Sequence, residues 1–570
     1  MKNIFKYLTL SICLLLLNAC EENFLDTPPE DQLTDETFWT DESSVKTFAY
    51  GFYTAYFTGY GSGWTWGHYF SGESFNDDFG PTSPDRFVQQ VPTSGGGWDF
   101  SWVRKANIFI NRVQDVDMGE EAIDHWTGIG RFFRALEYHD LVKSFGGVPY
   151  YDQELSEDDD ELLYKPRDSR EYVMDKVLED LQFAADNVRE SVDNNGQEVN
   201  RDVVLAYMSR IMLWEGTWQK YLENNSDKAK EYLEAAKWAA EQIIDAGKYS
   251  LDNYREAFNS LDLSGNPEMI LYRQYETGET THTLVSYNNA EPQTGISKDA
   301  LDTYLGDDGL PIALSGVYEG DHGIDNLVAN RDPRMGQTIV PYELRISGIA
   351  SNFSTTGVSI HKFLNEEIKD TPQGFSLDNN TDAPIIRFGE VLVNYAEAVA
   401  ELATVGGPSL TQDDLDKSIN ILRDRPGVNM PHLQVIGGNP AVNGATFDDP
   451  DRDSNVPSLI WEVRRERRIE LMMEGFRHDD LRRWKKLEYV DMVDNEDINR
   501  GAWIDKSDYP DANLSNITLT DGDTGYIIPA SASASLRTYD DPKVYLNPIP
   551  MDQIKLYEDH GVTLEQNPGW

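Results

Sequence analysis

The sequence predicts a mostly α-helical protein, a scaffold of paired helices that carries long irregular loops and short β elements. Stretches with an apolar residue at every third or fourth position, which are typical of amphipathic helices, recur through the first half of the chain. The long segments between and after them are rich in Gly, Pro, Asn and Asp, residues that favour turns and loops. Strands are therefore expected only as short runs inside the loops.

Helical periodicity defines the expected scaffold. It covers residues 103–116, 129–145, 169–190, 201–222, 227–247 and 385–402. In residues 227–247, small side chains such as Ala236 and Ala240 permit close contact between helices, and Gly247 is expected to end the helix. Several of these helices follow one another closely, which resembles pairing of the tetratricopeptide type, although the consensus of that repeat is not met.

The irregular segments are residues 51–102, 262–380 and 488–545. Long irregular segments in a compact protein are more often functional than accidental, so we expect binding residues there. Residues 36–570 are expected to form a single domain, with an N-terminal part of about residues 36–260 and a C-terminal part of about residues 261–570.

The start of the chain has the features of an export signal that ends in a lipid anchor. A short positive leader precedes residues 8–17, a largely apolar run that is too short for a bilayer, which needs about 20 residues. The run ends in Leu17-Asn18-Ala19-Cys20, which resembles the lipobox of bacterial lipoproteins. We expect residues 1–19 to be removed and Cys20 to carry lipid at the head of a tether, residues 20–35. The alternative is an ordinary secretory signal that ends near a cysteine.

Cysteine content and net charge limit how the fold is stabilised and which partners the protein can bind. Lipidation of Cys20 and loss of Cys13 with the signal leave no thiol for a disulfide, so hydrophobic burial has to stabilise the fold. The formal net charge is −50 at pH 7. Such a protein is repelled by the phosphates of nucleic acid and by anionic lipid surfaces. The composition therefore excludes nucleic-acid binding.

An aromatic cluster occupies residues 50–102. It holds four of the thirteen tryptophans, namely Trp64, Trp66, Trp98 and Trp102. Rings placed between glycines, as most of these are, are often displayed rather than buried. An indole face stacks on the C–H face of a sugar ring, and Asp77, Asp78 and Arg86 offer hydrogen bonds to sugar hydroxyls. The cluster favours a ligand site; the alternative is that the rings plug loops onto the core.

A second dense segment, residues 461–484, resembles a catalytic site. Glu466, Glu470 and Glu474 lie four residues apart on one helix face, and paired carboxylates are what glycoside hydrolysis requires. However, arginines surround them, and a carboxylate beside a guanidinium has a lowered pKa and is a poor general acid. We therefore favour a structural ion-pair network. A surface glycoside hydrolase that uses Glu466 or Glu470 remains an alternative.

Other catalytic and metal motifs are absent or weak. The nine histidines are scattered, and no HExxH, GxSxG, Walker or GxGxxG motif occurs. Residues 521–525, Asp-Gly-Asp-Thr-Gly, hint at a calcium loop, but Ala532 stands where the terminal carboxylate ligand belongs. We expect an ordinary turn there, and neither a cofactor nor a metal.

Short motifs spread along the whole chain resemble one known family. In the first part they are Phe24-Leu25-Asp26-Thr27-Pro28, Lys105-Ala106-Asn107-Ile108, Arg131-Phe132-Phe133-Arg134-Ala135-Leu136 and Phe145-Gly146-Gly147-Val148-Pro149. In the second part they are Asn330-Arg331-Asp332-Pro333-Arg334, Ile386-Arg387-Phe388-Gly389-Glu390, the charged segment 461–484, and Gln566-Asn567-Pro568-Gly569-Trp570. In this order they resemble the SusD/RagB outer-membrane nutrient-binding lipoproteins of Bacteroidetes.

The resemblance implies a non-enzymatic protein that lies on the cell surface as a lid over a SusC-like TonB-dependent transporter. Such proteins hold oligosaccharides, or in some branches peptides, for import. Acidic residues behind Cys20 resemble a signal for the outer face of the outer membrane. The implied sugar site is an aromatic arc, with one side in the 60–102 cluster and the other near Tyr275 and Tyr287. A helical-repeat scaffold that binds only proteins remains a further alternative.

Overall fold

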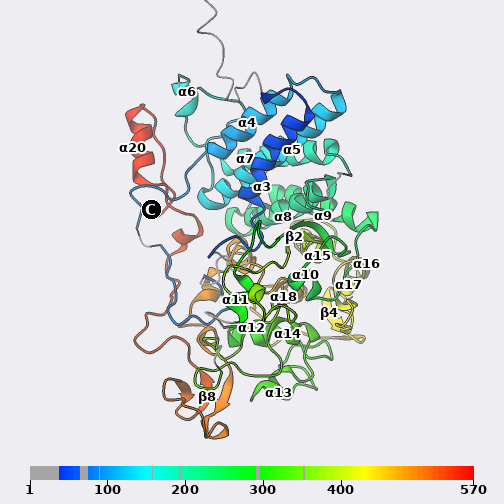
Figure 1. The fold of residues 1–570 in the computed structure, drawn as a ribbon, viewed down its shortest axis with the longest axis vertical. Helices are drawn as coiled ribbons and strands as arrows, with labels where there is room; N and C mark the ends of the chain where they lie inside the picture. Colours follow the sequence, from blue (N-terminus) through cyan, green and yellow to red (C-terminus); the bar gives the residue numbers. More distant parts are fainter. Residues whose placement is uncertain are drawn as a thin grey trace, which may run out of the picture.

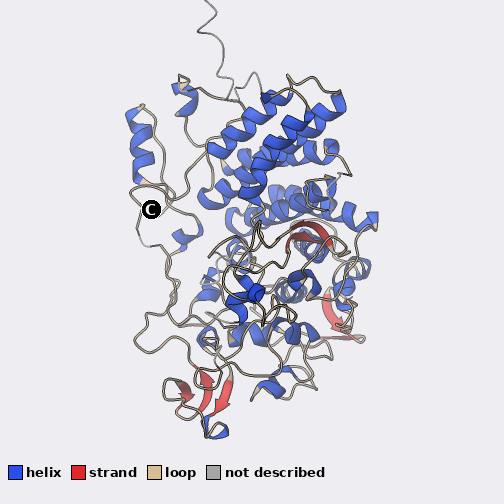
Figure 2. Ribbon diagram, viewed as in Figure 1, coloured by secondary structure: helices blue, strands red, loops and turns tan. Residues whose placement is uncertain are grey.

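The structure of the chain is a computed structural model. It describes residues 38–64, 75–88, 90–156, 158–191, 196–289, 295–350 and 353–570, with residues 287–289 described for their backbone only. The expected lipid-bearing Cys20 and its tether therefore lie outside the described residues. As the sequence predicts, the described chain is mostly helical, with a few short strands inside long loops (Figures 1 and 2).

The helices of the first half form one side of the molecule (Figure 1). They are α3 (Glu42–Tyr56), α4 (Ser101–Val113), α5 (Glu120–Phe145), α6 (Asp160–Leu163), α7 (Arg170–Asn187), α8 (Arg201–Trp218), a π-helical turn (Gln219–Glu223) and α9 (Ser226–Ala246). Neighbours in sequence pack together, most extensively α8 with α9, and α5 packs against both α4 and α7. The predicted pairing of helices is confirmed.

Local sequence explains where these helices begin and end. Side chains of Ser169, Asn200 and Asn225 accept hydrogen bonds from the first turns of α7, α8 and α9, which satisfies backbone N–H groups that lack a partner inside the helix. Helix α9 ends at Gly247, which has the left-handed φ of 61° that glycine tolerates. The predicted end of this helix is thus confirmed.

Helix α5 starts nine residues before the stretch that periodicity predicts. Gly128 and Gly130 obscure the pattern because glycine has low helix propensity. In the fold both lie at helix contacts, since a Cβ on Gly128 would lie 2.9 Å from Val188 Cγ2 and one on Gly130 would lie 2.6 Å from Ile110 Cγ1. Close packing of neighbouring segments, which a single sequence does not reveal, therefore keeps these glycines inside a helix.

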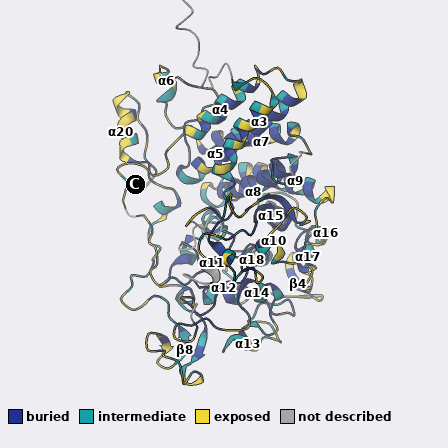
Figure 3. Cartoon of the chain, viewed as in Figure 1, coloured by how far each residue is buried: buried dark blue, intermediate teal, exposed yellow. Residues whose placement is uncertain are grey.

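The second half contains short elements joined by long loops. Its helices are α10 (Glu256–Asn259), α11 (Leu284–Asn289), α12 (Lys298–Thr303), α13 (Ile324–Val328), α14 (Pro333–Thr338), α15 (Phe388–Leu402), α16 (Gln412–Asp416), α17 (Ile419–Arg423), α18 (Ser458–Glu470), α19 (Arg477–Arg483) and α20 (Met551–Asp559). Helix α15 is buried along its whole length and packs against α8, α9 and α18 (Figure 3). It therefore joins the two halves.

Three small antiparallel sheets occur in the described part of the second half. They are β1 (Met269–Arg273) with β2 (Ala383–Arg387); β3 (Gln434–Ile436), β4 (Asn439–Val442) and β5 (Ala445–Thr446); and β6 (Trp503–Asp505), β8 (Thr524–Ile527) and β7 (Leu519–Asp521). The expected helix at 385–402 is therefore shorter, because residues 385–387 pair with β1 before the chain turns into α15. Residues 521–525 form the β7–β8 turn, as the sequence predicts.

Hydrophobic packing follows the same division. One large cluster fills the helical side and includes α15, whereas a second cluster, which contains Tyr60, Tyr254 and Tyr275, lies under the loops. Among the described helices, none has both the length and the apolar character that crossing a bilayer requires. The loop cluster matters most for the site, because it supports the segment that follows α3.

Candidate functional site

The segment from Phe57 to Trp64, here called the Trp64 loop, follows α3 and presents an indole to solvent. Trp64 is 60% exposed, more than any other large apolar side chain among the described residues. An indole exposed to this extent offers an apolar ring face on which a ligand can stack. Display of the ring, which the sequence favours for the aromatic cluster, therefore holds at Trp64.

Buried rings hold the Trp64 loop from beneath. The Tyr60 hydroxyl donates to the carbonyl of Phe258 at 2.6 Å, and the Tyr275 hydroxyl donates to the carbonyl of Gly61 at 2.7 Å. The two phenol rings lie 6.3 Å apart and nearly parallel, with His282 within 5.0 Å of both. Burial lowers the pKa of His282 to about 3, so this ring is neutral in the core. The loop is therefore anchored on the second hydrophobic cluster.

Close approach of the backbone also shapes the loop. Gly59 has a left-handed φ of 54°, and a Cβ at this position would lie 2.9 Å from the Cβ of Ala383 in β2. Only glycine fits both conditions without strain. Glycine thus brings the loop against the β1–β2 pair, and Trp64 follows three residues after the carbonyl that Tyr275 holds.

Tyr275 has a different role from the one expected. The sequence places it on the second side of a sugar-binding arc, but its side chain is 2% exposed and lies below the Trp64 loop. It supports the exposed indole and offers no ring face to solvent.

Tyr287 lies in α11 and its side chain is outside the described residues, as is Trp66. Arg86 is exposed in the loop after Phe79.

The carboxylates of Asp77 and Asp78 do not face solvent, contrary to the expectation that they bind hydroxyls. Arg477 forms two hydrogen bonds with Asp77 at 2.7 and 2.6 Å, and Arg468 donates to Asp78 at 2.9 Å. Burial alone would raise the pKa of Asp77, but Arg468 and Arg477 outweigh it and hold this pKa at about 2. Both acids are structural partners of arginines that are distant in sequence.

The backbone of the same segment ties two loops together. Phe79 and Ile296 form a β-bridge, and the Ser297 hydroxyl donates to the carbonyl of Asp77 at 2.6 Å. The backbone N–H of Ser297 donates to the carbonyl of Asp78 at 2.8 Å. Residues 75–80 and 295–297 are therefore fixed against each other, beside α12.

Trp98 packs inside the molecule, so the alternative of a ring that plugs a loop onto the core applies to it. Only 7% of the side chain is exposed. Its ring meets Phe145 edge to face at 5.1 Å and Phe100 at 5.6 Å. The preceding glycines, Gly95 to Gly97, have positive φ angles and turn the chain so that the indole points to the core. Exposure between glycines, which the sequence favours, holds for Trp64 and not for Trp98.

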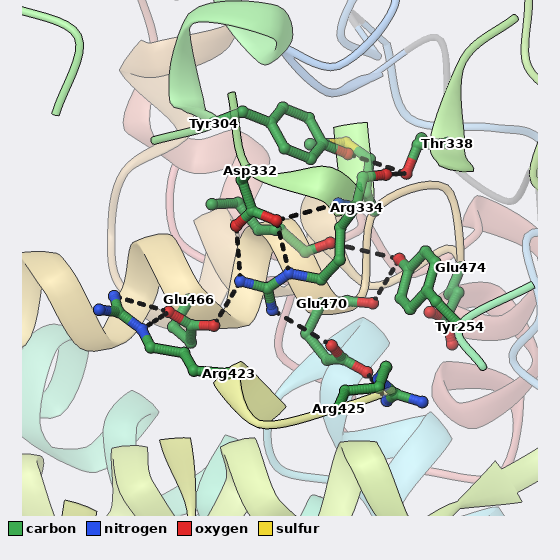
Figure 4. A network of polar contacts seen from close by, with 12 residues as sticks. Tyr254, Tyr304, Asp332, Arg334, Thr338, Arg423, Arg425, Glu466, Glu470 and Glu474 are labelled. Atoms are coloured by element: carbon green, nitrogen blue, oxygen red, sulfur yellow. Dashed lines mark hydrogen bonds and ion pairs between the residues drawn. The ribbon is translucent and has the colours of Figure 1, made fainter. Parts of the chain in front are cut away.

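The charged segment belongs to an ion-pair network, as the sequence predicts, but the arginines that pair with Glu466 and Glu470 come from outside residues 461–484. Figure 4 shows Arg334 between Asp332, Glu466 and Glu470, with distances of 2.7 Å to the first two and 3.3 Å to Glu470. Arg387 and Arg425 also contact Glu470, at 2.7 and 2.6 Å.

Burial opposes ionisation of Glu470, but its arginines outweigh this effect and lower the pKa to about 2. Glu470 is fully buried and Glu466 is 1% exposed. A general acid needs a proton near neutral pH and access to its substrate. Neither condition is met at Glu470, and Glu466 lacks access, so the geometry favours a structural role for both carboxylates.

The anchoring of the Trp64 loop is the part of the site that the sequence does not reveal. Tyr60 and its partner Phe258 are 198 residues apart, and Tyr275 is 214 residues from Gly61. No local pattern marks such contacts. The only signal is a run of Gly and Tyr beside the tryptophans, which indicates a shaped loop but not what supports it.

Comparison with known proteins shows which family the chain is similar to. A model of the SusD family matches residues 267–570, and one described as starch-binding associating with outer membrane matches residues 98–213. A SusD-like protein of Formosa agariphila is 24% identical over 518 residues, which are 85% of this chain and 92% of the relative.

Solved structures share the fold. A SusD-like carbohydrate binding protein from Bacteroides fragilis has a TM-score of 0.67 at 22% identity, over 92% of this chain and 99% of the other. A laminarin binding SusD-like protein has a TM-score of 0.54 at 16% identity, over 93% of this chain and all of the other. With the family model covering more than half of its length, the chain belongs to the SusD family.

Proposed function

We propose that the chain is a non-catalytic glycan-binding lipoprotein of the cell surface, which captures oligosaccharides on the Trp64 loop and delivers them to a SusC-like TonB-dependent transporter. The observation that carries the proposal is the exposed indole of Trp64 on an anchored loop. Family membership supports a carbohydrate ligand, since similar structures are those of a carbohydrate binding and a laminarin binding protein.

Stacking explains why an anchored indole suits a sugar. The apolar C–H face of a pyranose covers an aromatic face while its hydroxyls remain hydrated at the rim. A loop whose backbone is already held in place loses little conformational freedom on binding, so more of the contact energy appears as affinity. The hydrogen bonds from Tyr60 and Tyr275 provide this preorganisation.

Calorimetric titration with a panel of oligosaccharides tests the proposal. We expect binding, with the ligand recovered intact by mass spectrometry. Trp64→Ala should weaken binding at least tenfold, which is about 1.4 kcal/mol. Trp238→Ala is the matched control, because Trp238 is 38% exposed on α9 and belongs to the helical side. Equal affinity of the Trp64→Ala variant and the unaltered protein would contradict the proposed site, and cleaved ligand would contradict a purely binding role.

Anchoring and delivery require a separate experiment in cells. Cys20→Ser should move the protein from the membrane fraction to the soluble fraction, because the lipid-bearing thiol is lost. The unaltered protein should co-purify with a TonB-dependent transporter after cross-linking. Unchanged membrane attachment of the Cys20→Ser variant would contradict the anchor, and absence of any transporter from the cross-linked complex would contradict delivery.

A further inference from the structure

A concave site lies beside α18, apart from the Trp64 loop. This cavity, here called the α18 pocket, has a volume of about 480 Å³. Residues of α12 and α18 line it, together with the segments around 311–313, 449–453 and 484–497. None of its lining residues belongs to the Trp64 loop. Pockets that hold small molecules have volumes of roughly 300–1,000 Å³, so this one has room for a sugar of one or two units.

Aromatic rings line the pocket, and hydrogen bonds fix their edges. The indole N–H of Trp461 donates to Asp449 at 3.2 Å, and the Tyr489 hydroxyl donates to Asp453 at 2.6 Å. Both side chains are half-buried and line the cavity. A ring whose polar edge already has a partner contributes its apolar surface to the wall, which is the surface that a sugar ring covers.

Charged side chains form much of the wall, and several of them are already paired with one another or with a neighbouring side chain. Arg468 lies 2.7 Å from Asp299, and Arg465 lies 3.0 Å from Glu462 and also contacts Asp449. Arg477 holds Asp77 at 2.6 Å. These pairs fix the positions of guanidinium donors and carboxylate acceptors along one wall. The carboxylates keep unused lone pairs, which accept hydrogen bonds from hydroxyl groups.

The net charge of the side chains around the pocket indicates which class of ligand fits it. Nine acidic and five arginine side chains line the pocket. Lys298 and Lys486, behind the wall, pair with Asp302 and Asp453. The surroundings therefore retain a small negative excess, which opposes a sulfated or uronic sugar. No group of three or more His, Cys, Asp or Glu that could hold a metal occurs in the described chain. A neutral ligand with many hydroxyls fits, because each hydroxyl both donates and accepts.

We propose that the α18 pocket is a second carbohydrate site, which takes one or two units of a neutral sugar against Trp461 and hydrogen-bonds them through the paired carboxylates and guanidiniums. This site is distinct from the Trp64 loop, so an experiment can contradict one of the two proposed binding sites and leave the other standing.

Blocking the pocket from its rim tests the proposal without disturbing the ion pairs. Ala313 lines the cavity and is exposed, so Ala313→Trp fills the space and leaves the core intact. Leu314→Trp is the matched control, because Leu314 is its neighbour, is 40% exposed and does not line the pocket. All variants are made in the full chain, and their unfolding curves are compared first.

The probes are maltose, cellobiose, lactose, mannobiose and xylobiose, with galacturonic acid as the anionic counterpart, in calorimetry and saturation-transfer NMR. We expect at least one neutral disaccharide to bind both the unaltered protein and the Trp64→Ala variant, and Ala313→Trp to weaken this binding at least tenfold while Leu314→Trp leaves it unchanged. Binding that survives Ala313→Trp but is lost in Trp64→Ala would overturn the proposal. So would binding of galacturonic acid alone, or no disaccharide binding at millimolar concentration.

Discussion

The Trp64 loop and helix α18 belong to the two segments that the sequence marks as candidate sites, and the fold uses them in opposite ways. The loop leaves an apolar indole 60% exposed, whereas α18 buries Glu466 and Glu470 among arginines. The two glutamates, whose residue type suggests catalysis, are thus shielded from substrate. The tryptophan, whose residue type is common in protein cores, is exposed. Exposure, rather than chemical type, separates the binding surface from the scaffold.

Energetics account for the difference. An ion pair in the interior is stable only when each charge has a partner. The members of the network are therefore held in place by one another and are not available for chemistry. The exposed indole needs no partner to fold, and its apolar face is free to contact a ligand. Changes in the network should therefore act on stability, and changes in the loop should act on affinity.

The largest expected effect comes from breaking the network. Arg387→Ala removes contacts with Glu268, Glu470 and Glu474, which leaves three buried carboxylates with one cation fewer. We expect the free energy of unfolding to fall by about 3–5 kcal/mol in urea denaturation. Lys555→Ala, at an exposed pair with Asp559, should leave it nearly unchanged. A similar small change in both variants would contradict a scaffolding role for the network.

Acid should weaken the network before it affects the loop. Arginines lower the pKa of Glu470 to about 2 from an ordinary 4.5, although burial raises it, and Lys220 and Arg464 act in the same way on Glu401. Because both pKa values are lower in the folded protein, their stabilisation is complete above about pH 4.5 and is lost as the pH falls towards 2. It is on the order of 3 kcal/mol for each group.

Urea midpoints measured from pH 6 down to pH 2.5 test this dependence. They should fall steeply below pH 4.5, while affinity for a neutral oligosaccharide stays constant between pH 5 and pH 8, since Trp64 does not titrate. A flat stability profile would contradict the low pKa values. An affinity that follows the stability profile would contradict the separation of the two regions.

The smallest expected effect concerns the support beneath the loop. Tyr275→Phe removes the hydrogen bond to the Gly61 carbonyl, and we expect it to cost about 1 kcal/mol of stability and a few-fold loss of oligosaccharide affinity. Tyr232→Phe removes a hydrogen bond to Asp175 in the helical side, so it should cost similar stability with no loss of affinity. Equal affinities of the two variants would show that Tyr275 does not position Trp64.

Local sequence predicts the helical scaffold well because its signals are local. Apolar spacing, the cap residues Asn200 and Asn225 and the stop at Gly247 each act within a few residues. The ion-pair network is predictable only in part: α18 shows its own glutamates, but the arginines that pair with Glu470, such as Arg334 and Arg387, lie far away in the sequence. The buried position of Asp77 is not predictable, because Arg477, which pairs with its carboxylate, is 400 residues away in sequence. Local patterns also do not distinguish the buried Trp98 from the exposed Trp64.

A crystal structure of the protein with a bound oligosaccharide tests the central claim most directly. The ligand for this experiment is the oligosaccharide that titrates most tightly. The account predicts a sugar ring stacked on the indole of Trp64, with Tyr60 and Tyr275 unmoved beneath the loop and no sugar within contact of Glu466 or Glu470. An oligosaccharide that leaves Trp64 bare, or one that reaches Glu466 or Glu470, would contradict it.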